Sequence, residues 1–340
     1  MTNLEKIKIG IIGAGIVVAN YHLPVLNEIE GLKVVWVCDT DLSKAKKLAK
    51  KYGIKEYNDN INKLEEVDIA LIAIPVGARS RYLKYFLGKK TSLLIEKPLC
   101  ENILEYENII NLSKKNNNEI GVGFMRRSYH STNELSQLFN SKTFGPVKKI
   151  TASEGLNSRG LNIDNNYYQN KKELTGGGVL IETGSHLIDQ VFSIFKINNF
   201  KITNIKINSN SGIDLDTKIN SILFSDQQSD EIEFNFRVSK LIDLPNKILT
   251  EFQEFKISID LSPESSIYIL DNNFNKLAKI KMKNNYGHAK EIYQAFYIEW
   301  KNFIEQVKNK KTGKFCITLK SSFLTVNFIE QAYKKNYHEK

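Results

Sequence analysis

Three side chains able to carry protons, Glu182, His186 and Asp189, lie four and three residues apart in the segment 176–189, GGGVLIETGSHLID. Residues at these spacings share one face of an α-helix, so we expect the two carboxylates and the imidazole to form a polar stripe on an otherwise apolar helix. Such a stripe is costly when it faces protein, unless it is paired or used. An imidazole between carboxylates suits proton transfer, although a satisfied core histidine would give the same pattern.

A second candidate site lies near the amino terminus, where the apolar run 7–12 leads into Gly13 and Gly15. A buried strand, a glycine turn and a helix in this order are typical of a dinucleotide-binding turn. The first glycine permits the tight turn, the second lets a diphosphate approach the backbone, and the helix N-terminus presents N–H groups to the anion. Val18 occupies the third position of the fingerprint, usually Gly or Ala, so the motif alone is a weak signal.

The strand ends that follow strengthen this prediction. The apolar run 32–38 ends at Asp39, and two further predicted strands end at Pro75 and Glu96. An acid at the end of the second strand suits the ribose 2′-hydroxyl of NAD and repels the 2′-phosphate of NADP, although Asp39 could also cap the next helix. Strands that alternate with helices predict a doubly wound parallel sheet, with ligands at the carboxyl ends of its strands. The predicted cofactor-binding residues are Gly13, Gly15, Ile16, Val17, Asp39, Ile74, Pro75, Glu96 and Lys97.

Composition narrows the class of protein. The chain has 340 residues, 41% hydrophobic and 25% charged, which predicts a soluble protein of about two domains. Its formal charge of +10 comes from scattered lysines, so we expect no nucleic-acid partner, and no run is apolar enough to cross a membrane. We expect no leader before the first strand, because residues 1–6 show neither a basic and apolar pattern nor a cleavage site. Three distant cysteines predict a reducing, cytoplasmic location with neither a disulfide framework nor a metal site. The cysteines are Cys38, Cys100 and Cys316.

The second half is rich in short segments of alternating or β-rich composition, separated by Asn, Asp, Gly and Ser turns. These segments predict a large, mostly antiparallel sheet with one face packed on helices such as 179–195 and the other face open. The predicted fold is α/β, with a Rossmann domain over 1–122 and an α+β domain over 123–340 whose terminal helices can pack back on the first. The predicted strands are 147–154, 201–208, 218–224, 231–238, 251–260 and 266–270, and the closing helices are 289–308 and 320–335.

Four segments together resemble the glucose–fructose oxidoreductase, inositol dehydrogenase and MocA-like (Gfo/Idh/MocA) family: 13–24, 96–98, 121–127 and 176–189. The resemblance covers almost the whole chain, and its most specific parts are the EKP tripeptide and the GGG…H helix. It implies an NAD(P)-dependent enzyme in which Lys97 and His186 act on a hydroxyl or keto group beside the nicotinamide. Glu182 stands where the family usually has Asp, which keeps the charge but moves it by one methylene.

The resemblance also implies where substrate binds. It puts Arg127 near the substrate, although a solvated arginine is an equal alternative, and Asp189 close by. Tyr168, in the loop 155–174 before the GGG helix, is expected either to contact a sugar or to pack. Pairing of the open sheet faces implies a homodimer or homotetramer. Val76 and Arg79 replace the Asn and His of many relatives, and Arg79 or a nearby lysine would receive a 2′-phosphate if NADP were preferred.

The hypothesis from the sequence is hydride transfer between NAD and a carbinol or keto carbon of a small carbohydrate-like substrate, such as a sugar, a polyol or a nucleotide-linked derivative. His186 exchanges the proton, Lys97 stabilises the alkoxide, and Glu182 or Asp189 orients His186. Three alternatives remain open: an NAD-dependent glycoside hydrolase that oxidises its sugar transiently, an imine reductase, and a nucleotide-binding regulator without catalysis.

Overall fold

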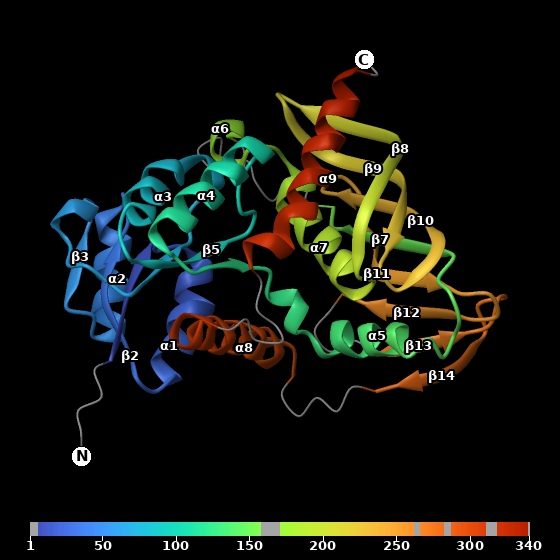
Figure 1. The fold of residues 1–340 in the computed structure, drawn as a ribbon, viewed down its shortest axis with the longest axis horizontal. Coiled ribbons are helices and arrows are strands. Elements are labelled where there is room, and N and C mark those ends of the chain that lie inside the picture. Colours follow the sequence, from blue (N-terminus) through green and yellow to red (C-terminus); the bar gives the residue numbers. More distant parts are fainter. Residues whose placement is uncertain (1–5, 158–170, 262–265, 282–286, 311–317, 339–340) are drawn as a thin grey trace. The chain divides into compact units, whose positions relative to one another are not determined.

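The computed structural model divides into two compact units (Figure 1). The first unit contains Met1–Cys100, Leu104–Met125 and Ile292–Ser322, and the second contains Glu101–Ile103, Arg126–Glu291 and Phe323–Lys340. The residues that the structure describes are 6–157, 171–261, 266–281, 287–310 and 318–338.

The first unit is built on a six-stranded parallel sheet with the strand order β3-β2-β1-β4-β5-β6. This order reverses at β1, which confirms the predicted doubly wound fold. The apolar runs that predicted the strands are buried on both faces; Ile9, Ile11 and Leu71, for example, are fully buried. The strands are β1 (Ile7–Ile12), β2 (Leu32–Cys38), β3 (Glu56–Asn58), β4 (Ile69–Ile72), β5 (Ser92–Glu96) and β6 (Ile120–Gly123).

Helices on both faces of this sheet position the loops at its carboxyl edge. The helix after the glycine turn contains a π-turn, η1 (Val18–His22), that runs into α1 (Leu23–Glu28). Asp41 caps α2 (Leu42–Tyr52), because its side chain accepts hydrogen bonds from the N–H groups of Ser43 and Lys44. The other helical elements here are η2 (Ile61–Lys63), η3 (Val76–Ala78), α3 (Ser80–Leu87), α4 (Ile103–Asn116) and α8 (Gly287–Asn309).

The second unit is built on an eight-stranded sheet with the order β14-β13-β12-β11-β7-β10-β9-β8. All neighbouring strands in it are antiparallel except β7 and β10, so the predicted mostly antiparallel sheet is confirmed. The strands are β7 (Lys149–Gly155), β8 (Ile197–Asn210), β9 (Ile213–Ser225), β10 (Gln228–Ser239), β11 (Leu244–Glu251), β12 (Lys256–Asp260), β13 (Ile267–Leu270) and β14 (Lys276–Ile280).

This sheet differs from the prediction at β11, β12 and β14. Residues 251–260 were predicted as one strand, but Glu251 is the last residue of β11, whose residues 244–250 were not predicted, and β12 begins at Lys256. Between the two strands the backbone N–H of Phe252 donates to the carbonyl oxygen of Phe255. β14 was not predicted, because all five of its residues are exposed and it carries no alternating pattern of burial.

One face of the large sheet carries the core of this unit. Apolar side chains of the sheet pack there with α7 (Ser185–Ile194) and with Phe328 of α9 (Leu319–His338), and α5 (His130–Asn140) contributes Leu135. The remaining helical elements of this unit are η4 (Met125–Ser128), α6 (Lys172–Thr175) and η6 (Leu180–Gly184).

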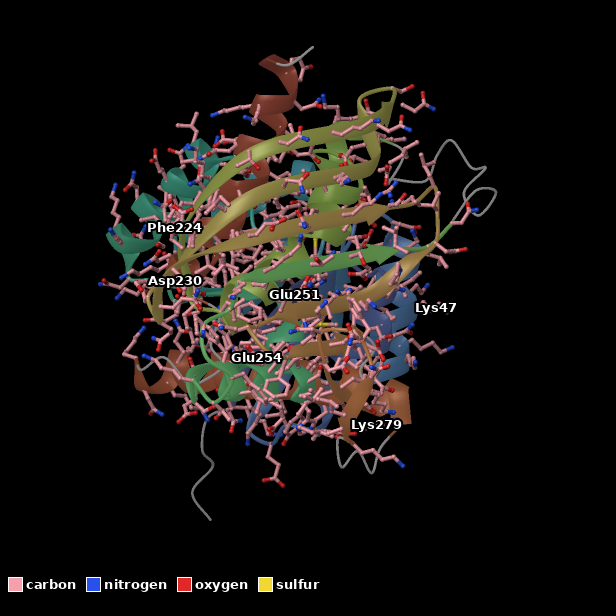
Figure 2. The ribbon with its side chains drawn as sticks, turned by 90° about the vertical axis from the view of Figure 1, so that its right-hand side faces the viewer. Lys47, Phe224, Asp230, Glu251, Glu254 and Lys279 are labelled. Atoms are coloured by element: carbon pink, nitrogen blue, oxygen red, sulfur yellow. The ribbon has the colours of Figure 1, made fainter. Side chains whose placement is uncertain are left out.

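The other face of the sheet carries polar pairs between strands. Ion pairs join Lys149 to Glu233 at 2.9 Å and Arg237 to Asp216 at 3.1 Å. Figure 2 looks onto these strands and labels Phe224 of β9. Exposed ion pairs of this kind add little stability, so they contribute less than a second layer packed on this face of the sheet would. Among the described residues, no helix is long and apolar enough to cross a membrane.

Candidate active site

The parallel order β2-β1-β4-β5 brings four predicted positions to one edge of the first sheet. Gly13, Asp39 and Glu96 stand at the carboxyl ends of β1, β2 and β5, and Pro75 lies three residues beyond the end of β4. In doubly wound folds this edge is where ligands bind. The loops predicted to bind the cofactor are therefore neighbours in the fold.

The glycine turn leaves backbone open to a ligand. Gly13 has a φ of +104°, and a Cβ atom there would lie 2.3 Å from the carbonyl oxygen of Ala73, so no other residue fits. A Cβ atom on Gly15 would meet nothing within 4 Å, and Ile16 next to it is 73% exposed. An open backbone followed by a helix N-terminus fits a diphosphate. Val18, the departure from the fingerprint, is fully buried in the core.

Asp39 is tied to this turn. One of its carboxylate oxygens accepts a hydrogen bond from the backbone N–H of Ala14 at 2.6 Å, and the other accepts from the N–H of Asp41 at 2.8 Å. A carboxylate offers about four acceptor positions, so both oxygens retain capacity for ribose hydroxyls. Since Asp41 provides the cap of α2, the structure separates the two roles that the sequence left open for Asp39.

Arg79 joins the loops that follow β4 and β5. Its side chain is 2% exposed, and its guanidinium donates to the carbonyl oxygens of Ile74 at 2.8 Å, of Lys97 at 3.5 Å and of Pro98. The guanidinium is thus committed to backbone carbonyls. Arg79 or a nearby lysine was expected to receive a 2′-phosphate only if NADP were preferred; in the structure Arg79 joins two loops of the cofactor edge.

Glu96 was predicted to contact the cofactor, but its described hydrogen bonds are internal. Oε1 pairs with Nε2 of His22 at 2.9 Å, and Oε2 accepts from the backbone N–H of Lys97 at 3.1 Å. Burial tends to raise the pKa of Glu96, but the hydrogen bond from His22 and the charges of Lys97 and Arg79 outweigh it, so this pKa is lowered. We therefore revise its role: Glu96 is an anion that holds the backbone of Lys97.

In the second unit, the GGG turn is fastened to β9 and α9. The buried carboxylate of Asp214 accepts hydrogen bonds from the N–H groups of Gly178 at 2.6 Å and Leu180 at 2.7 Å, and from the hydroxyl of Tyr333 at 2.7 Å. A Cβ atom on Gly178 would lie 2.0 Å from the carbonyl oxygen of Asp214, and one on Gly177 would lie 2.4 Å from the Tyr333 hydroxyl. The glycines therefore allow β9 and α9 to lie close to the start of the segment that carries Glu182 and His186.

The predicted continuous helix is interrupted at its start. Leu180–Gly184 forms a π-turn, η6, before α7 begins at Ser185. A π-turn widens the helix and shifts side chains around its axis, and such turns are frequent at functional sites. Glu182 lies in this turn and His186 in the first turn of α7, so the simple i, i+4 face expected from the sequence does not apply.

Each acid of the predicted stripe has a basic partner. Glu182 Oε2 lies 2.6 Å from Lys240 Nζ, with both side chains partly exposed. Asp189 is 1% exposed and accepts two hydrogen bonds from Arg127, at 2.8 Å from Nε and 2.5 Å from Nη2. Burial raises the pKa of Asp189, and the Arg127 guanidinium opposes that rise. Asp189 is too buried to contact a substrate as predicted; it holds Arg127 instead.

Sequence reasoning missed several supporting residues, including Asp214, Lys240 and Tyr333. A further bidentate pair, Arg126 with Glu154 at 2.7 and 2.8 Å, fixes η4 on β7. No local motif marks these residues, because each meets a partner far away in the chain. Tyr168 and Cys316 lie outside the described residues. Among the residues that are described, no cluster of three or more His, Cys, Asp or Glu side chains could hold a metal ion.

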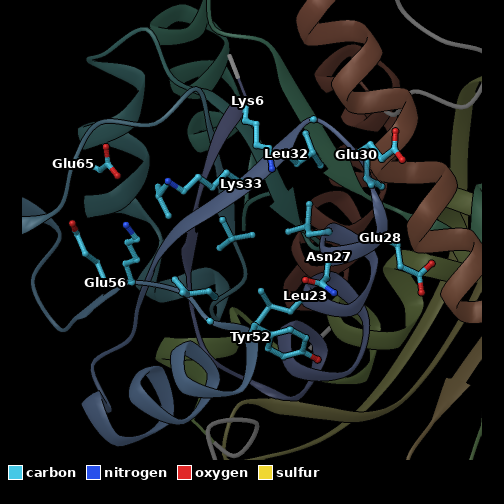
Figure 3. Close-up of a pocket in the computed structure, with 18 residues that line it drawn as sticks. Lys6, Leu23, Asn27, Glu28, Glu30, Leu32, Lys33, Tyr52, Glu56 and Glu65 are labelled. Atoms are coloured by element: carbon cyan, nitrogen blue, oxygen red, sulfur yellow. The ribbon is translucent and has the colours of Figure 1, made fainter. Parts of the chain in front are cut away.

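A cavity of about 390 Å³ in the first unit lies elsewhere (Figure 3). Its walls include Leu32 at the start of β2 and Tyr52 at the end of α2, with Lys33 and Glu56 close by. It is therefore at the amino end of β2, whereas Asp39 follows the carboxyl end of the same strand. The cavity is not the predicted dinucleotide site.

Comparison with known proteins places these features in context. Residues 7–124 match the model of an oxidoreductase family with an NAD-binding Rossmann fold. Glucose-6-phosphate 3-dehydrogenase of Bacillus subtilis is 26% identical over 207 residues, which are 61% of this chain and 58% of that protein. The match thus spans less than two thirds of this relative's length.

Two solved structures share the fold over nearly their whole length. An aldose–aldose oxidoreductase from Caulobacter crescentus, complexed with glycerol, has a TM-score of 0.81 and 16% identity and covers 98% of both chains. A 3-ketoreductase from Actinomadura kijaniata, in complex with NADP and TDP-benzene, has a TM-score of 0.81 and 14% identity and covers 97% of both chains. At these identities the likeness establishes the fold alone.

Proposed function

We propose that this chain transfers a hydride between a bound nicotinamide dinucleotide and a carbinol or keto carbon of a sugar, a polyol or a sugar derivative. The proposal is supported by the match of residues 7–124 to the Gfo/Idh/MocA oxidoreductase family, whose model describes an NAD-binding Rossmann fold, and by the similarity to a glucose-6-phosphate 3-dehydrogenase. The observation that carries this proposal is the carboxyl edge of the first sheet. There the turn at Gly15 is open, Asp39 is tied to it, and Lys97 follows the end of β5.

The residues at this edge fit the dinucleotide. The backbone of Gly13 and Gly15 and the helix N-terminus at Ile16 and Val17 would hold the diphosphate, and Asp39 would accept hydrogen bonds from the ribose. NAD is preferred to NADP, because the negative charge of Asp39 repels a 2′-phosphate and Arg79 is committed to carbonyl oxygens. The bound dinucleotide supplies the hydride acceptor for oxidation or the hydride donor for reduction.

The chain's own residues manage the proton and the charge on oxygen. In the oxidative direction, the substrate C–H bond gives up a hydride and its O–H bond gives up a proton, which His186 accepts. The ammonium of Lys97 stabilises the oxygen as negative charge develops on it. In the reductive direction His186 returns the proton. Glu182 with Lys240, and Asp189 with Arg127, fix the polar surroundings of His186 and the substrate.

A substrate screen with matched variants tests this function. Purified protein is mixed with NAD and individual sugars, polyols and phosphorylated or nucleotide-linked sugars, and NADH formation is followed. Lys97→Met and His186→Ala should each lower turnover at least about 100-fold while leaving NADH affinity within about threefold, since these groups act on the substrate oxygen. Release of an aglycone with catalytic NAD would favour the glycoside hydrolase instead. Turnover close to wild type in the double variant would overturn the assignment.

We also propose that subunits pair through the outer face of the large sheet. That face carries ion pairs such as Lys149 with Glu233 and Arg237 with Asp216, which suit a hydrated interface. Light scattering on the eluting protein should give a dimer or tetramer that Arg237→Glu dissociates. A monomer at all protein concentrations would contradict this proposal.

A further inference from the structure

A buried histidine links the glycine-turn helix to the residue before Lys97. His22, the last residue of η1, is 0% exposed and lies between two partners. Trp300 Nε1 is 3.0 Å from its Nδ1, and Glu96 Oε1 is 2.9 Å from its Nε2. The indole nitrogen can only donate, so Nδ1 of His22 accepts and carries no proton. Nε2 therefore carries the proton of the ring and donates it to Glu96.

The Glu96 carboxylate, which is fixed by His22, also binds the backbone of Lys97. Its second oxygen accepts the backbone N–H of Lys97 at 3.1 Å, so one carboxylate bridges the imidazole and the lysine backbone. Gly123 of β6 leaves room for it, because a Cβ atom there would lie 3.1 Å from the Glu96 side-chain carboxyl carbon. The Glu96 carboxylate at the end of β5 thereby holds His22 of η1, and α8 joins this chain through the hydrogen bond from Trp300 to His22.

A second buried acid keeps this cluster at a single negative charge. Glu299, next to Trp300 in α8, is 5% exposed, and neither of its carboxyl oxygens has a hydrogen-bond partner among the described residues. Burial, and then the charge of Glu96, raise its pKa well above the usual range. Glu299 is therefore the neutral acid and Glu96 the anion, and Glu96 remains available to accept from both His22 and Lys97.

We propose that His22 is a positioning residue for Lys97: together with Trp300 it fixes the Glu96 carboxylate, and through it the backbone of the lysine that carries the reactive amine. Since the amine must meet a developing charge on the substrate oxygen, a small displacement of its backbone is expected to reduce turnover more than binding. The catalytic consequence rests on the proposed function, whereas the hydrogen-bond chain does not.

The chain offers matched variants. His22→Leu removes both hydrogen bonds, His22→Gln keeps one donor and one acceptor, and Trp300→Phe removes only the indole donor. Nitrogen NMR of ¹⁵N-histidine-labelled protein should show His22 with a protonated Nε2 and an unprotonated Nδ1 in wild type, and a tautomer mixture in Trp300→Phe. Hydrogen exchange at the Lys97 amide should be at least about tenfold faster in His22→Leu than in wild type, with His22→Gln in between.

Kinetics with a substrate from the screen then test the consequence. His22→Leu should lower kcat about 30-fold to 100-fold with KM and NADH affinity within about threefold, and His22→Gln should recover much of that loss. A protonated Nδ1 in wild type, unchanged exchange at Lys97 in His22→Leu, or equal kcat in His22→Leu and wild type would each overturn the proposal. If wild type neither binds NADH nor turns over any substrate, the proposed function fails, while the tautomer and exchange measurements still decide the positioning role.

Discussion

The carboxylate of Asp39 accepts a hydrogen bond from the backbone N–H of Ala14 at 2.6 Å, so the acid that ends β2 is fastened to the glycine turn that follows β1. This contact fixes the carboxylate proposed to bind the ribose against the turn proposed to bind the diphosphate before any ligand arrives. Groups that are positioned in advance lose less conformational entropy when the ligand binds.

Asp39→Ala is therefore expected to weaken NADH binding at least about tenfold, which corresponds to the loss of one hydrogen bond to a charged group. It should also reduce the ratio of NADH affinity to NADPH affinity. Fluorescence titration with each nucleotide measures both effects. Asp41→Ala is the matched control two residues away: loss of the α2 cap should cost about 1 kcal/mol of stability and leave NADH affinity within about twofold. Equal effects of the two variants on affinity would show that Asp39 serves only the local turn.

Arg79→Met should destabilise the first unit and lower turnover. The change removes the donors to the carbonyl oxygens of Ile74 and Lys97, and unsatisfied buried carbonyls cost about 1–3 kcal/mol each. Arg79→Lys keeps the charge but not the planar fork, so it should recover only part of this loss. Thermal unfolding and kcat are the measurements. A selective loss of NADPH affinity in Arg79→Met would instead indicate a phosphate-binding role.

Glu299 predicts a specific dependence of stability on pH. Its folded pKa is raised above the ordinary value of 4.5, so between those two values the folded protein holds one more proton than the unfolded chain. Stability from this group is therefore complete below about pH 4.5 and is lost as pH rises towards the folded pKa. Glu299→Gln, which needs no proton, should gain about 1.4 kcal/mol per pH unit relative to wild type across this window.

Denaturant unfolding of wild type and Glu299→Gln from pH 5 to about pH 8 gives this difference directly. Glu305→Gln, an exposed position on the same helix α8, is the control and should follow wild type throughout. A difference between Glu299→Gln and wild type that stays constant with pH would mean that Glu299 does not hold a proton in the folded protein.

Asp214→Ala should release the GGG turn from its hydrogen bonds to β9. It leaves two N–H groups and the hydroxyls of Thr217 and Tyr333 without their acceptor, so we expect a loss of at least about 2 kcal/mol of stability together with reduced turnover. Tyr333→Phe removes one of these four hydrogen bonds and should cost about 1 kcal/mol. Asp216→Asn, which affects only an outer-face ion pair, should change stability by less than about 1 kcal/mol. Similar losses in Asp214→Ala and Asp216→Asn would rule out the anchoring role.

The sequence predicted those parts of the fold whose cause is local. β1, β2, β4 and β5 are predominantly apolar, as expected of parallel strands buried on both faces. Gly13 was identifiable because a tight turn needs a residue without a Cβ atom. By contrast, β3 has three polar residues and β14 is wholly exposed, so neither carries a burial pattern that a sequence could reveal.

The site was predicted less completely because its supports are long-range. Asp214 and Tyr333 are separated by 119 residues, and His22 and Trp300 by 278. Only the fold brings them together. The π-turn at Leu180–Gly184 also lacks a local signal, because the same apolar spacing fits a regular α-helix. Asp189 was expected near the substrate from the family resemblance, whereas its burial depends on the packing of α9, from which the Thr325 hydroxyl donates to its carboxylate at 3.4 Å.

The most direct test of the central claim is a fluorescence titration of the purified wild-type protein with NADH and, separately, with NADPH. Tight binding of NADH and much weaker binding of NADPH is the predicted result, because Asp39 accepts the ribose hydroxyls and Arg79 is not free to meet a 2′-phosphate. Binding of neither nucleotide would contradict the account, since it would mean that the Rossmann fold has been kept without its cofactor.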